Sequence, residues 1–428
     1  MKVAVIGLGY VGLPLALKLA KTHQVFGYDI NKDRIANLKN KIDINQESTI
    51  KSFKYIKNIE FINEESKLKN LDFYIIAVPT PIYQNKKPNL KNLISAIKLV
   101  AKNIKNRSTV IIESTVYPGV TEEICVPILK KISKLKYLDF ENIGNAKGFF
   151  CGFCPERVNP GDKTHTIDKI TKVISGSNKL AINKIKKLYY SVNGSNIYIA
   201  KSIKVAEAAK IIENTQRDLN IALINELSQI FKKININTRD VLDAASTKWN
   251  FMKFYPGLVG GHCIGVDPYY LTHMCKNIGF RPQVILAGRK INDDMPLYVA
   301  NRFLQNLRRN KLKFSNCRIL VAGLSFKENV SDIRNSKSIE IIKILKKNNL
   351  KLDIYDPLVS NEILDNQIII KDLKKLKKNY FDAIMILVPH SIIISELSKN
   401  LNILKKSKKT IIFDIKNSLT GIKSNFTL

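Results

Sequence analysis

The segment from Pro256 to Asp267 combines one cysteine with four glycines and a closing aspartate, reading Pro-Gly-Leu-Val-Gly-Gly-His-Cys-Ile-Gly-Val-Asp. Glycine permits positive φ angles and lets a ligand or a second backbone approach closely. A thiol in such a loop, here Cys263, can be exposed and activated as a nucleophile, whereas a structural cysteine usually lies in an apolar helix or strand. Taken alone, the loop is equally consistent with a tight turn that carries an incidental cysteine.

A second pattern lies near the amino terminus, where Gly7-Leu-Gly-Tyr-Val-Gly12 has the spacing G-x-G-x-x-G. It follows a predicted strand over 2–7 and opens a predicted helix over 13–21, the context of a dinucleotide-binding turn. The helix amino terminus attracts the pyrophosphate through its N–H groups and dipole. The alternative is a glycine turn in an unrelated α/β fold. The residues predicted to bind the pyrophosphate are Gly7, Gly9, Tyr10, Val11 and Gly12.

An aspartate at the end of the second predicted strand, 23–28, indicates which dinucleotide binds. Asp29 follows Gly9 by 20 residues and can accept both hydroxyls of the adenosine ribose. The carboxylate repels a 2′-phosphate, so the pattern predicts NAD and not NADP. Arg34 lies about one helical turn later and is expected to flank the adenine, although an arginine here can also favour a 2′-phosphate.

Polar residues follow the ends of further predicted strands. Thr80 stands in Ala-Val-Pro-Thr-Pro and Thr115 in Glu-Ser-Thr-Val-Tyr. Ligands of open α/β sheets bind beyond the carboxyl ends of strands, so both threonines are expected near the nicotinamide, unless each caps the following helix. A later Pro- and Gly-rich loop carries Glu156 and Arg157, which fit either a general base with an anion clamp or a surface ion pair.

A segment without glycine or proline, from about 205 to 231, predicts a helix of roughly 40 Å. Such a helix can connect domains or form a dimer interface. Lys210, Asn214 and Arg217 follow one another at helical spacing, with Glu207 one turn earlier, and form a polar stripe. The stripe is either solvated surface or, because the rest of the helix is largely apolar, the lining of a cleft.

Composition limits the classes of function. The formal net charge is +34, but only 12 of the 70 basic residues are arginines, and the lysines are scattered among Asn and Ile. Nucleic-acid binders more often cluster arginine with aromatic residues, so no nucleic-acid partner is predicted. No apolar run reaches the length of a membrane span, and residues 1–6 form a strand and not a signal peptide. A cytoplasmic protein without a membrane partner is expected.

The six cysteines show no disulfide framework. Cys151 and Cys154 form a C-x-x-C pair, which can be redox-active or half of a metal site. No second such pair and no H-x-x-x-H pattern completes a zinc site, so we interpret the pair as incidental and predict no metal.

Strands and helices alternate through the first 200 residues and again after 315, which predicts parallel sheets with βαβ crossovers. The expected fold is α/β, with two Rossmann-like doubly wound domains joined by the long helix. The predicted parts are an NAD-binding domain over 1–200, a central helical part with the cysteine loop over 201–300, and a second Rossmann-like domain over 301–428. The final dozen residues are expected to be loosely ordered.

Six motifs, in this order along nearly the whole chain, resemble the UDP-glucose/GDP-mannose 6-dehydrogenase family. They are Gly7–Gly12, Ser114–Thr115, Pro155–Arg157, Ala209–Asn214, Gly260–Asp267 and Gly323–Arg334. The sequences Gly-Gly-His-Cys-Ile-Gly-Val-Asp-Pro and Glu-Asn-Thr-Gln-Arg-Asp-Leu-Asn are most similar to the branch that oxidises UDP-N-acetylhexosamines (UDP-GlcNAc or UDP-GalNAc) for capsule and O-antigen synthesis. In the glucose branch a serine typically precedes the cysteine, where this chain has His262.

The resemblance implies oxidation of the C6 alcohol to a carboxylate with two NAD⁺, in a homodimer. Cys263 would capture the aldehyde as a thiohemiacetal and pass through a thioester that water hydrolyses. The implied catalytic residues are Cys263, Lys210, Asn214, Asp267, Glu156 and Thr115. The implied contacts to the UDP sugar are Arg157, Val158, Lys210, Asn214, Arg217, Gly260 and Lys327. Arg334 would reach the NAD pyrophosphate together with the glycine turn, and the family arginine upstream of the cysteine loop is replaced by Lys248 or Lys253.

Three other functions remain open at this point. A UDP-ManNAc or UDP-glucose dehydrogenase would share the chemistry. A two-electron hydroxyacid dehydrogenase would need no cysteine, and a non-catalytic NAD-binding regulator would need none of the catalytic residues.

Overall fold

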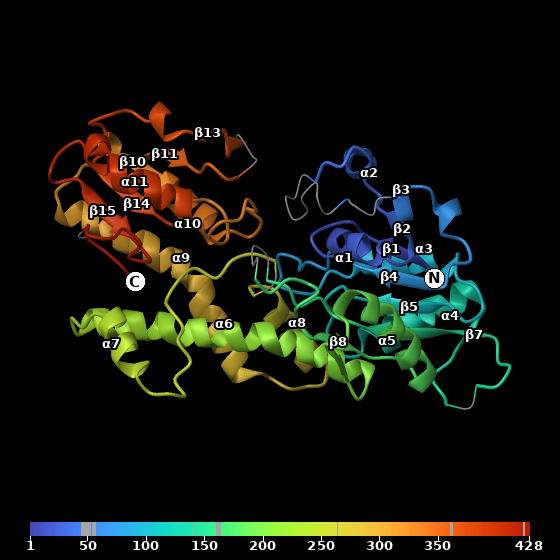
Figure 1. Cartoon of the computed structure of the whole chain (residues 1–428). Helices are drawn as coiled ribbons and strands as arrows, with labels where there is room; N and C mark the ends of the chain where they lie inside the picture. Colours follow the sequence, from blue (N-terminus) through green and yellow to red (C-terminus); the bar gives the residue numbers. More distant parts are fainter. Residues whose placement is uncertain are drawn as a thin grey trace. The chain divides into compact units, whose positions relative to one another are not determined.

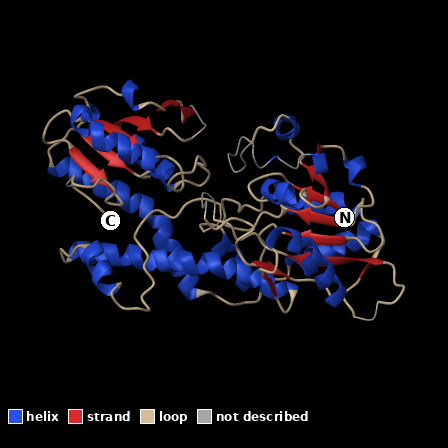
Figure 2. Cartoon of the chain, viewed as in Figure 1, coloured by secondary structure: helices blue, strands red, loops and turns tan. Residues whose placement is uncertain are grey.

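The chain folds into two units, which the computed structural model describes over residues 1–43, 53, 57–141, 143–159, 164–262, 264–359, 363–422 and 424–428. One unit comprises Met1–Glu213 and Tyr269–Arg281, and the other comprises Asn214–Pro268 and Pro282–Leu428. Figure 1 follows the chain through both units, and Figure 2 shows strands at the centre of each unit with helices around them. Both units have the predicted α/β fold with a largely parallel sheet.

The sheet of the first unit contains seven described strands, all paired in parallel. Their order is β3 (Ile59–Ile62), β2 (Gln24–Tyr28), β1 (Lys2–Ile6), β4 (Phe73–Ile76), β5 (Thr109–Ile112), β7 (Gly148–Phe153) and β6 (Lys136–Tyr137). The strand order reverses between β1 and β4, and sheets of this topology bind ligands at the carboxyl ends of the strands beside that reversal. The prediction of a parallel sheet is confirmed, although β3, β6 and β7 were not among the predicted strands.

Helices pack on both faces of this sheet because neighbouring strand residues point to opposite sides. In β1, Val3 packs toward one face and Ala4 toward the other. The first face is covered by α1 (Gly12–Leu19), α2 (Lys32–Lys39) and α5 (Lys179–Asn193). The second face is covered by α3 (Lys91–Ala101) and α4 (Val126–Ser133). The unit also contains the 3₁₀-helix η2 (Glu65–Leu68), the π-helix η3 (Val120–Cys125) and a separate parallel pair, β8 (Lys172–Ile174) and β9 (Ile197–Ile199).

The predicted long helix is α6 (Ile203–Lys233), which has 31 residues and contributes to both units. Three further helices follow it: α7 (Thr238–Ala245), α8 (Asp267–Asn277) and α9 (Gln283–Arg309). The sequence analysis did not identify α9, which contains Pro296. Proline removes a helical hydrogen bond and usually marks a helix end, so propensity alone argues against a continuous helix there. Burial of the surrounding apolar face, including Met295 and Val299, outweighs that cost.

The second unit has a sheet of six described strands, parallel except for the edge strand β12. The order is β12 (Ile363–Leu364), β13 (Gln367–Ile370), β11 (Lys351–Tyr355), β10 (Arg318–Ala322), β14 (Ala383–Ile386) and β15 (Ile411–Asp414). One face packs against α9 and α10 (Lys337–Lys347), and the other against α11 (Ser391–Leu404). The 3₁₀-helices η4 (Phe314–Asn316) and η5 (Leu373–Lys375) complete the unit. Within the described ranges, every helix is too short or too polar to span a lipid bilayer.

The prediction that the final dozen residues are loosely ordered is wrong for the positions that the structure describes. Phe426 is buried and stacks on Phe413 of β15, with ring centroids 4.2 Å apart. The backbone N–H of Asn425 donates to Ile412 O at 2.7 Å. A single buried aromatic side chain anchors this end of the chain, which an argument from terminal position alone does not anticipate.

Candidate active site

The glycine turn after β1 has the geometry that a dinucleotide requires. Gly7 has a φ of +92°, and its N–H donates to Tyr28 O at 2.8 Å. A Cβ on Gly12 would lie 1.8 Å from Gly7 O, so only glycine lets α1 start this close to the strand. A Cβ on Gly9 would meet no atom within 4 Å, and the α1 N-cap residue, Val11, makes no side-chain capping bond. The open space and the uncapped helix terminus fit a bound pyrophosphate.

Asp29 stands directly after β2 and has a carboxylate that already binds backbone. Its Oδ2 accepts from Leu8 N–H and its Oδ1 from Asn31 N–H, both at 2.9 Å. A carboxylate has about four acceptor positions, so two remain for ribose hydroxyls. Arg34 is buried, donates from Nε to Leu8 O at 3.0 Å and pairs through Nη1 with Asp43 at 2.8 Å. Arg34 therefore supports the glycine turn after β1, to which Asp29 is also bonded, a role that the sequence analysis missed.

The two threonines beyond β4 and β5 lie next to each other. Thr80 Oγ1 donates to Thr115 O at 2.8 Å, and Tyr270 OH donates to Thr80 O at 2.7 Å. Neither threonine caps the following helix, because the N-cap residues there are Leu90 and Gly119. The structure thus joins the two strand ends at which nicotinamide contacts were predicted.

Glu156 and Arg157 lie in the loop after β7 and are both engaged. Glu156 Oε1 accepts from the N–H groups of Arg157 and Val158, each at 2.7 Å. Arg157 Nε lies 2.7 Å from Glu213 Oε1 on α6, and its Nη1 donates to Thr171 O at 3.0 Å. Arg157 is thus ion-paired with Glu213 and not with Glu156, and this pair, which was not predicted, ties the loop to the helix that bears Lys210.

A buried charged cluster that sequence reasoning missed lies beside this loop. Lys172 Nζ is 2.8 Å from Glu113 Oε1 and 3.2 Å from Pro155 O, and Tyr189 OH also donates to Glu113. The Lys172 and Glu113 side chains are 5% and 0% exposed. Burial raises the pKa of Glu113, while burial opposes the charge on Lys172 but the carboxylates of Glu113 and Glu156 raise its pKa overall. The signal in the sequence was a lysine inside the short apolar strand β8.

The predicted polar stripe on α6 runs from buried to exposed positions. Glu207 is fully buried, and its carboxylate accepts from two backbone N–H groups at the start of η3, at 2.6 and 2.9 Å. Burial raises the pKa of Glu207 to about 7 in spite of these bonds. Lys210 is buried, Asn214 is half-buried, and Arg217 is exposed. Asn214 Nδ2 donates at 2.6 Å to Oδ2 of Asp267, which is 3% exposed at the start of α8.

The glycines of the cysteine loop allow a close approach to another loop of the second unit. Gly261 has a φ of +82°, and a Cβ there would lie 2.7 Å from the ring of Phe326. A Cβ on Gly260 would lie 2.8 Å from Asn335 O. Gly261 thus supplies a positive φ beside the Phe326 ring, and Gly260 allows close contact with the backbone of Asn335. Cys263 itself lies outside the described residues.

The start of the same loop is held by a buried amide network between α6 and α9. The Asn225 side chain exchanges two hydrogen bonds with the backbone of Gly257, at 3.0 and 2.8 Å, and donates to Asn292 Oδ1 at 2.8 Å. Asn292 donates to Asp218 Oδ1 at 2.8 Å, and Arg289 pairs with the same atom at 2.6 Å. This network was not predicted. It holds the backbone of Gly257, near the start of the cysteine loop, against α6.

A basic pocket lies beyond the carboxyl ends of β10 and β14 in the second unit. Its lining includes Lys327, Lys337 and Lys416, the carboxylate of Glu328 and two serines at the start of α10, Ser336 and Ser338. Lys416 pairs with Glu328, and Lys337 pairs with Asp293 and Glu340. Lysines and a helix amino terminus are the groups that bind phosphates. Lys327 is therefore in a position that suits a nucleotide diphosphate.

The predicted NAD contact Arg334 folds back onto a neighbour. Its guanidinium donates to both oxygens of Asp332, with Nη2 at 2.7 Å. Burial opposes ionisation of Asp332, but the bonds from Arg334 keep its pKa below the usual range. His262 Nδ1 lies 3.6 Å from the same carboxylate, and its ring meets the ring of Phe326 edge-on. The residue before the cysteine thus helps to hold the two loops together.

The C-x-x-C pair shows no sign of a redox or metal site. Cys151 in β7 and Cys154 just after it are both buried, and neither forms a disulfide. Burial raises the pKa of Cys154 to about 12 and that of Cys151 well above its usual value, which suppresses the reactive thiolate. Among the described residues, no three histidine, cysteine or acidic side chains gather as metal ligands would.

Comparison with protein families gives three matches along the chain. Residues 1–193 match the NAD binding domain of the UDP-glucose/GDP-mannose dehydrogenase family, residues 204–294 its central domain and residues 320–421 its UDP binding domain. The chain belongs to this family. It is therefore an NAD-dependent UDP-sugar dehydrogenase, and the family prediction from six motifs is confirmed.

Relatives of this dehydrogenase match it over their full length. UDP-N-acetyl-D-glucosamine 6-dehydrogenase of Salmonella typhi is 45% identical over 100% of this chain and 99% of its own. Protein CapL of Staphylococcus aureus is 47% identical over 99% and 97% of the two chains. Among solved structures, the UDP-D-ManNAc dehydrogenase of Pyrococcus horikoshii has a TM-score of 0.87 at 30% identity, covering 100% of this chain and 98% of its own.

The glycine turn with Asp29 is the part of the dehydrogenase site whose local geometry the sequence anticipated, whereas the bonds that join Thr80 to Thr115 and Asn214 to Asp267 were not predicted. The Lys172 cluster, the Asn225 network and the bracing by Arg34 were missed. Each of these depends on residues far apart in the sequence, and the odd polar residue in an apolar element was the only local signal.

Proposed function

We propose that this dehydrogenase oxidises the C6 hydroxyl of a UDP-N-acetylhexosamine, UDP-GlcNAc or UDP-GalNAc, to the uronate for surface polysaccharide synthesis. The observation that carries the proposal is the 2.6 Å bond between Asn214 on α6 and Asp267, which follows Cys263 by four positions in the sequence. The substrate assignment is supported by relatives named UDP-N-acetyl-D-glucosamine 6-dehydrogenase at 45% and 44% identity. Those named UDP-N-acetyl-D-mannosamine dehydrogenase reach 35%, and UDP-ManNAc is the second candidate substrate.

The proposed roles follow from the chemistry of each group. Two NAD⁺, bound in turn, would accept the hydrides of the two oxidations, alcohol to aldehyde and thiohemiacetal to thioester. The Cys263 thiolate forms a carbon–sulfur bond with the C6 aldehyde, and the ammonium of Lys210 and the amide of Asn214 stabilise the resulting oxyanion. At the thioester stage, water adds to the carbonyl carbon and the carbon–sulfur bond breaks, returning the thiolate. Asp267 orients the Asn214 amide and accepts a proton from that water.

The remaining site residues are proposed to bind and position. Glu156 and Thr115 assist the proton transfers, while Arg157, Val158, Arg217, Gly260 and Lys327 contact the UDP sugar. The glycine turn, Asp29, Thr80 and Arg334 contact NAD, and Arg34 supports the turn beside the adenine. In this proposal residues 1–200 bind NAD, 201–300 carry the cysteine loop, and 301–428 bind UDP.

The test is the yield of NADH and the identity of the sugar. Purified protein is incubated with UDP-GlcNAc, UDP-GalNAc, UDP-ManNAc and UDP-glucose, and NADH is followed at ~340 nm. Two NADH per UDP-N-acetylhexosamine support the proposal. One NADH per substrate would indicate a two-electron dehydrogenase, and no turnover with any sugar would leave an NAD-binding regulator.

The covalent step has its own test in Cys263→Ser. This variant should bind UDP-GlcNAc and NAD but stall, because a serine hydroxyl is a poor nucleophile at neutral pH. Cys317→Ser is the matched control, since burial raises the pKa of Cys317 to about 12 and keeps it an inert thiol. Wild-type uronate production by Cys263→Ser would rule out the covalent mechanism.

We also propose a homodimer that works in the cytoplasm. On α6, Leu223 and Ile230 are 53% and 47% exposed and, seven positions apart, lie on one face of the helix. Replacing Leu223 and Ile230 by aspartate should shift the mass measured by light scattering to that of a monomer. The five described cysteines are all free thiols, which suits a reducing compartment.

A further inference from the structure

The second unit repeats the strand-end geometry of the NAD turn. Gly323 follows β10 with a φ of +89°, and its N–H donates to Tyr355 O at 3.0 Å. The next N–H, of Leu324, donates to Asp356 Oδ2 at 2.7 Å. Gly7, Tyr28, Leu8 and Asp29 make the same contacts in the first unit. Asp356 therefore holds the position from which Asp29 would accept the ribose of NAD.

The two aspartates differ in what surrounds them. Asp29 is half-buried, whereas Asp356 is fully buried. Asp356 Oδ1 also accepts from the N–H groups of Leu358 and Val359, at 2.9 and 3.3 Å, and His390 Nε2 lies 3.2 Å from Oδ2. With these contacts the carboxylate has no place left for a ribose. In the second unit, Asp356 at the end of β11 therefore has a structural role.

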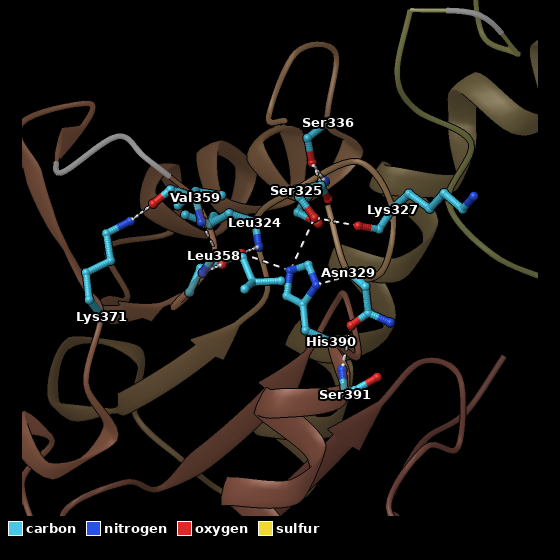
Figure 3. A network of polar contacts seen from close by, with 12 residues as sticks. Leu324, Ser325, Lys327, Asn329, Ser336, Leu358, Val359, Lys371, His390 and Ser391 are labelled. Atoms are coloured by element: carbon cyan, nitrogen blue, oxygen red, sulfur yellow. Dashed lines mark hydrogen bonds and ion pairs between the residues drawn. The ribbon is translucent and has the colours of Figure 1, made fainter. Parts of the chain in front are cut away.

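His390 uses both ring nitrogens to hold one loop (Figure 3). Its Nδ1 accepts from Asn329 N–H at 2.8 Å, which assigns the proton of the neutral imidazole to Nε2. Nε2 lies 3.2 Å from Ser325 Oγ, and Ser325 in turn donates to Lys327 O at 2.6 Å. Asn329 Oδ1 accepts from Ser391 N–H at 2.9 Å. The ring thus fixes both ends of the segment 325–329.

This segment connects the two functional loops of the second unit. Lys327 lines the basic pocket, and Phe326 lies against Gly261 and His262 of the cysteine loop. Ser336 Oγ, at the start of α10, donates to Ser325 O at 3.1 Å, so the segment is also tied to the helix terminus that lines the pocket. A shift of 325–329 would therefore move the pocket lysine and the support of the cysteine loop together.

We propose that His390, anchored by Asp356, is a positioning residue that sets the 325–329 segment for binding of the UDP diphosphate and for the geometry of the cysteine loop. The proposal rests on the proposed function, because it assumes that the basic pocket holds UDP. His390 is fully buried and acts through the 325–329 segment. The effect of His390 is expected on UDP binding and not on NAD binding, because the glycine turn at Gly7–Gly12 belongs to the other unit and takes part in none of the hydrogen bonds given for His390.

Three substitutions of His390 separate its two hydrogen bonds. His390→Asn retains an acceptor for Asn329 N–H, His390→Gln retains a donor toward Asp356 and Ser325, and His390→Leu retains neither. Binding of UDP and, separately, of NAD is measured by titration calorimetry at a temperature at which every variant is folded. We expect His390→Leu to weaken UDP binding about tenfold or more, with smaller losses for Asn and Gln, because an unmade buried hydrogen bond frees the segment. NAD binding should stay within about twofold, and kcat should fall as well.

Leu397→Ala is the matched control, because Leu397 is fully buried on α11 and its loss destabilises the same unit without touching the segment. It should bind UDP as the wild type does. If His390→Leu binds UDP normally, or Leu397→Ala weakens UDP binding equally, the positioning role is refuted. If His390→Leu does not fold, the Asn and Gln variants decide in the same way. If the wild type itself does not bind UDP, the proposed function fails and not the role of His390.

Discussion

Replacing Lys172 by methionine removes the only cation within 4.0 Å of the Glu113 carboxylate that the described structure records, while keeping most of the side-chain volume. Lys172 Nζ lies 2.8 Å from Glu113 Oε1, and both side chains are almost fully buried. Breaking a buried pair by removing one partner typically costs about 3–5 kcal/mol. The structure allows a sharper value, because the stranded carboxyl group can escape its unfavourable charge by taking up a proton.

Protonation of Glu113 limits how much stability the substitution can cost, and this upper bound depends on pH. Glu113 has an ordinary pKa of 4.5, and burial raises its pKa in the fold. Without Lys172 the folded protein keeps the proton at neutral pH, whereas the unfolded chain releases it. The electrostatic loss is then at most about 1.4 kcal/mol for each pH unit above 4.5, which is about 3.4 kcal/mol at pH 7 and about 0.7 kcal/mol at pH 5. The sign follows because the unfolded state binds fewer protons, so stability falls as the pH rises.

The assay is native-state hydrogen exchange of the amides in β5 and β7 at pH 5, 6 and 7, since it reports on the first unit alone and a protein of two units need not unfold in one step. Lys172→Met should lose about 3 kcal/mol at pH 7 and less than about 1 kcal/mol at pH 5. The double variant with Glu113→Gln should recover to within about 1 kcal/mol of the wild type, because no buried charge remains. A loss that is independent of pH, or no recovery in the double variant, would refute the reasoning.

Three further outcomes are expected. Burial raises the pKa of Glu207 to about 7, so the free energy of unfolding falls as the pH rises from about 4.5 to 7. The Glu207→Gln variant should lose this part of the pH dependence of stability in urea unfolding. An unchanged dependence of stability on pH would contradict the prediction. Gly12→Ala should reduce NAD binding at least ~100-fold in calorimetry, since its Cβ would lie 1.8 Å from Gly7 O, and normal affinity would contradict this. Asn225→Ala leaves buried backbone groups of Gly257 unpaired, at a cost of about 1–3 kcal/mol each. The variant should have a lower kcat in the NADH assay and an unchanged affinity for NAD. A kcat equal to that of the wild type would show that other contacts hold the cysteine loop.

The sequence was sufficient for features whose physical cause is local. The turn at Gly7 and Gly12, the acid at Asp29 and the long helix without glycine or proline each follow from spacing within a few dozen residues. Parallel strands with intervening helices also limit the topology to a small set, because right-handed crossovers dominate. These features were predicted and are present in the structure.

The features that the sequence did not reveal arise from contacts between distant segments. Lys172 meets Glu113 across 59 positions, and His390 meets Ser325 across 65. The lysine in the short apolar strand β8 was the only local signal of the buried ion pair, and nothing near His390 distinguishes an anchoring imidazole from a surface histidine. The helix around Pro296 was missed for a related reason, since tertiary burial overrides a local preference against helix.

The contacts of Asp29 have a consequence for attempts to change the cofactor from NAD to NADP. The usual route replaces the strand-end acid with a small or basic residue so that a 2′-phosphate is no longer repelled. Here that change would also remove the acceptors of Leu8 N–H and Asn31 N–H, which shape the turn and start α2. Cofactor preference and folding are therefore coupled through one carboxylate. A successful switch would need an uncharged acceptor, such as asparagine, at position 29, with the positive charge for the phosphate supplied from a different position.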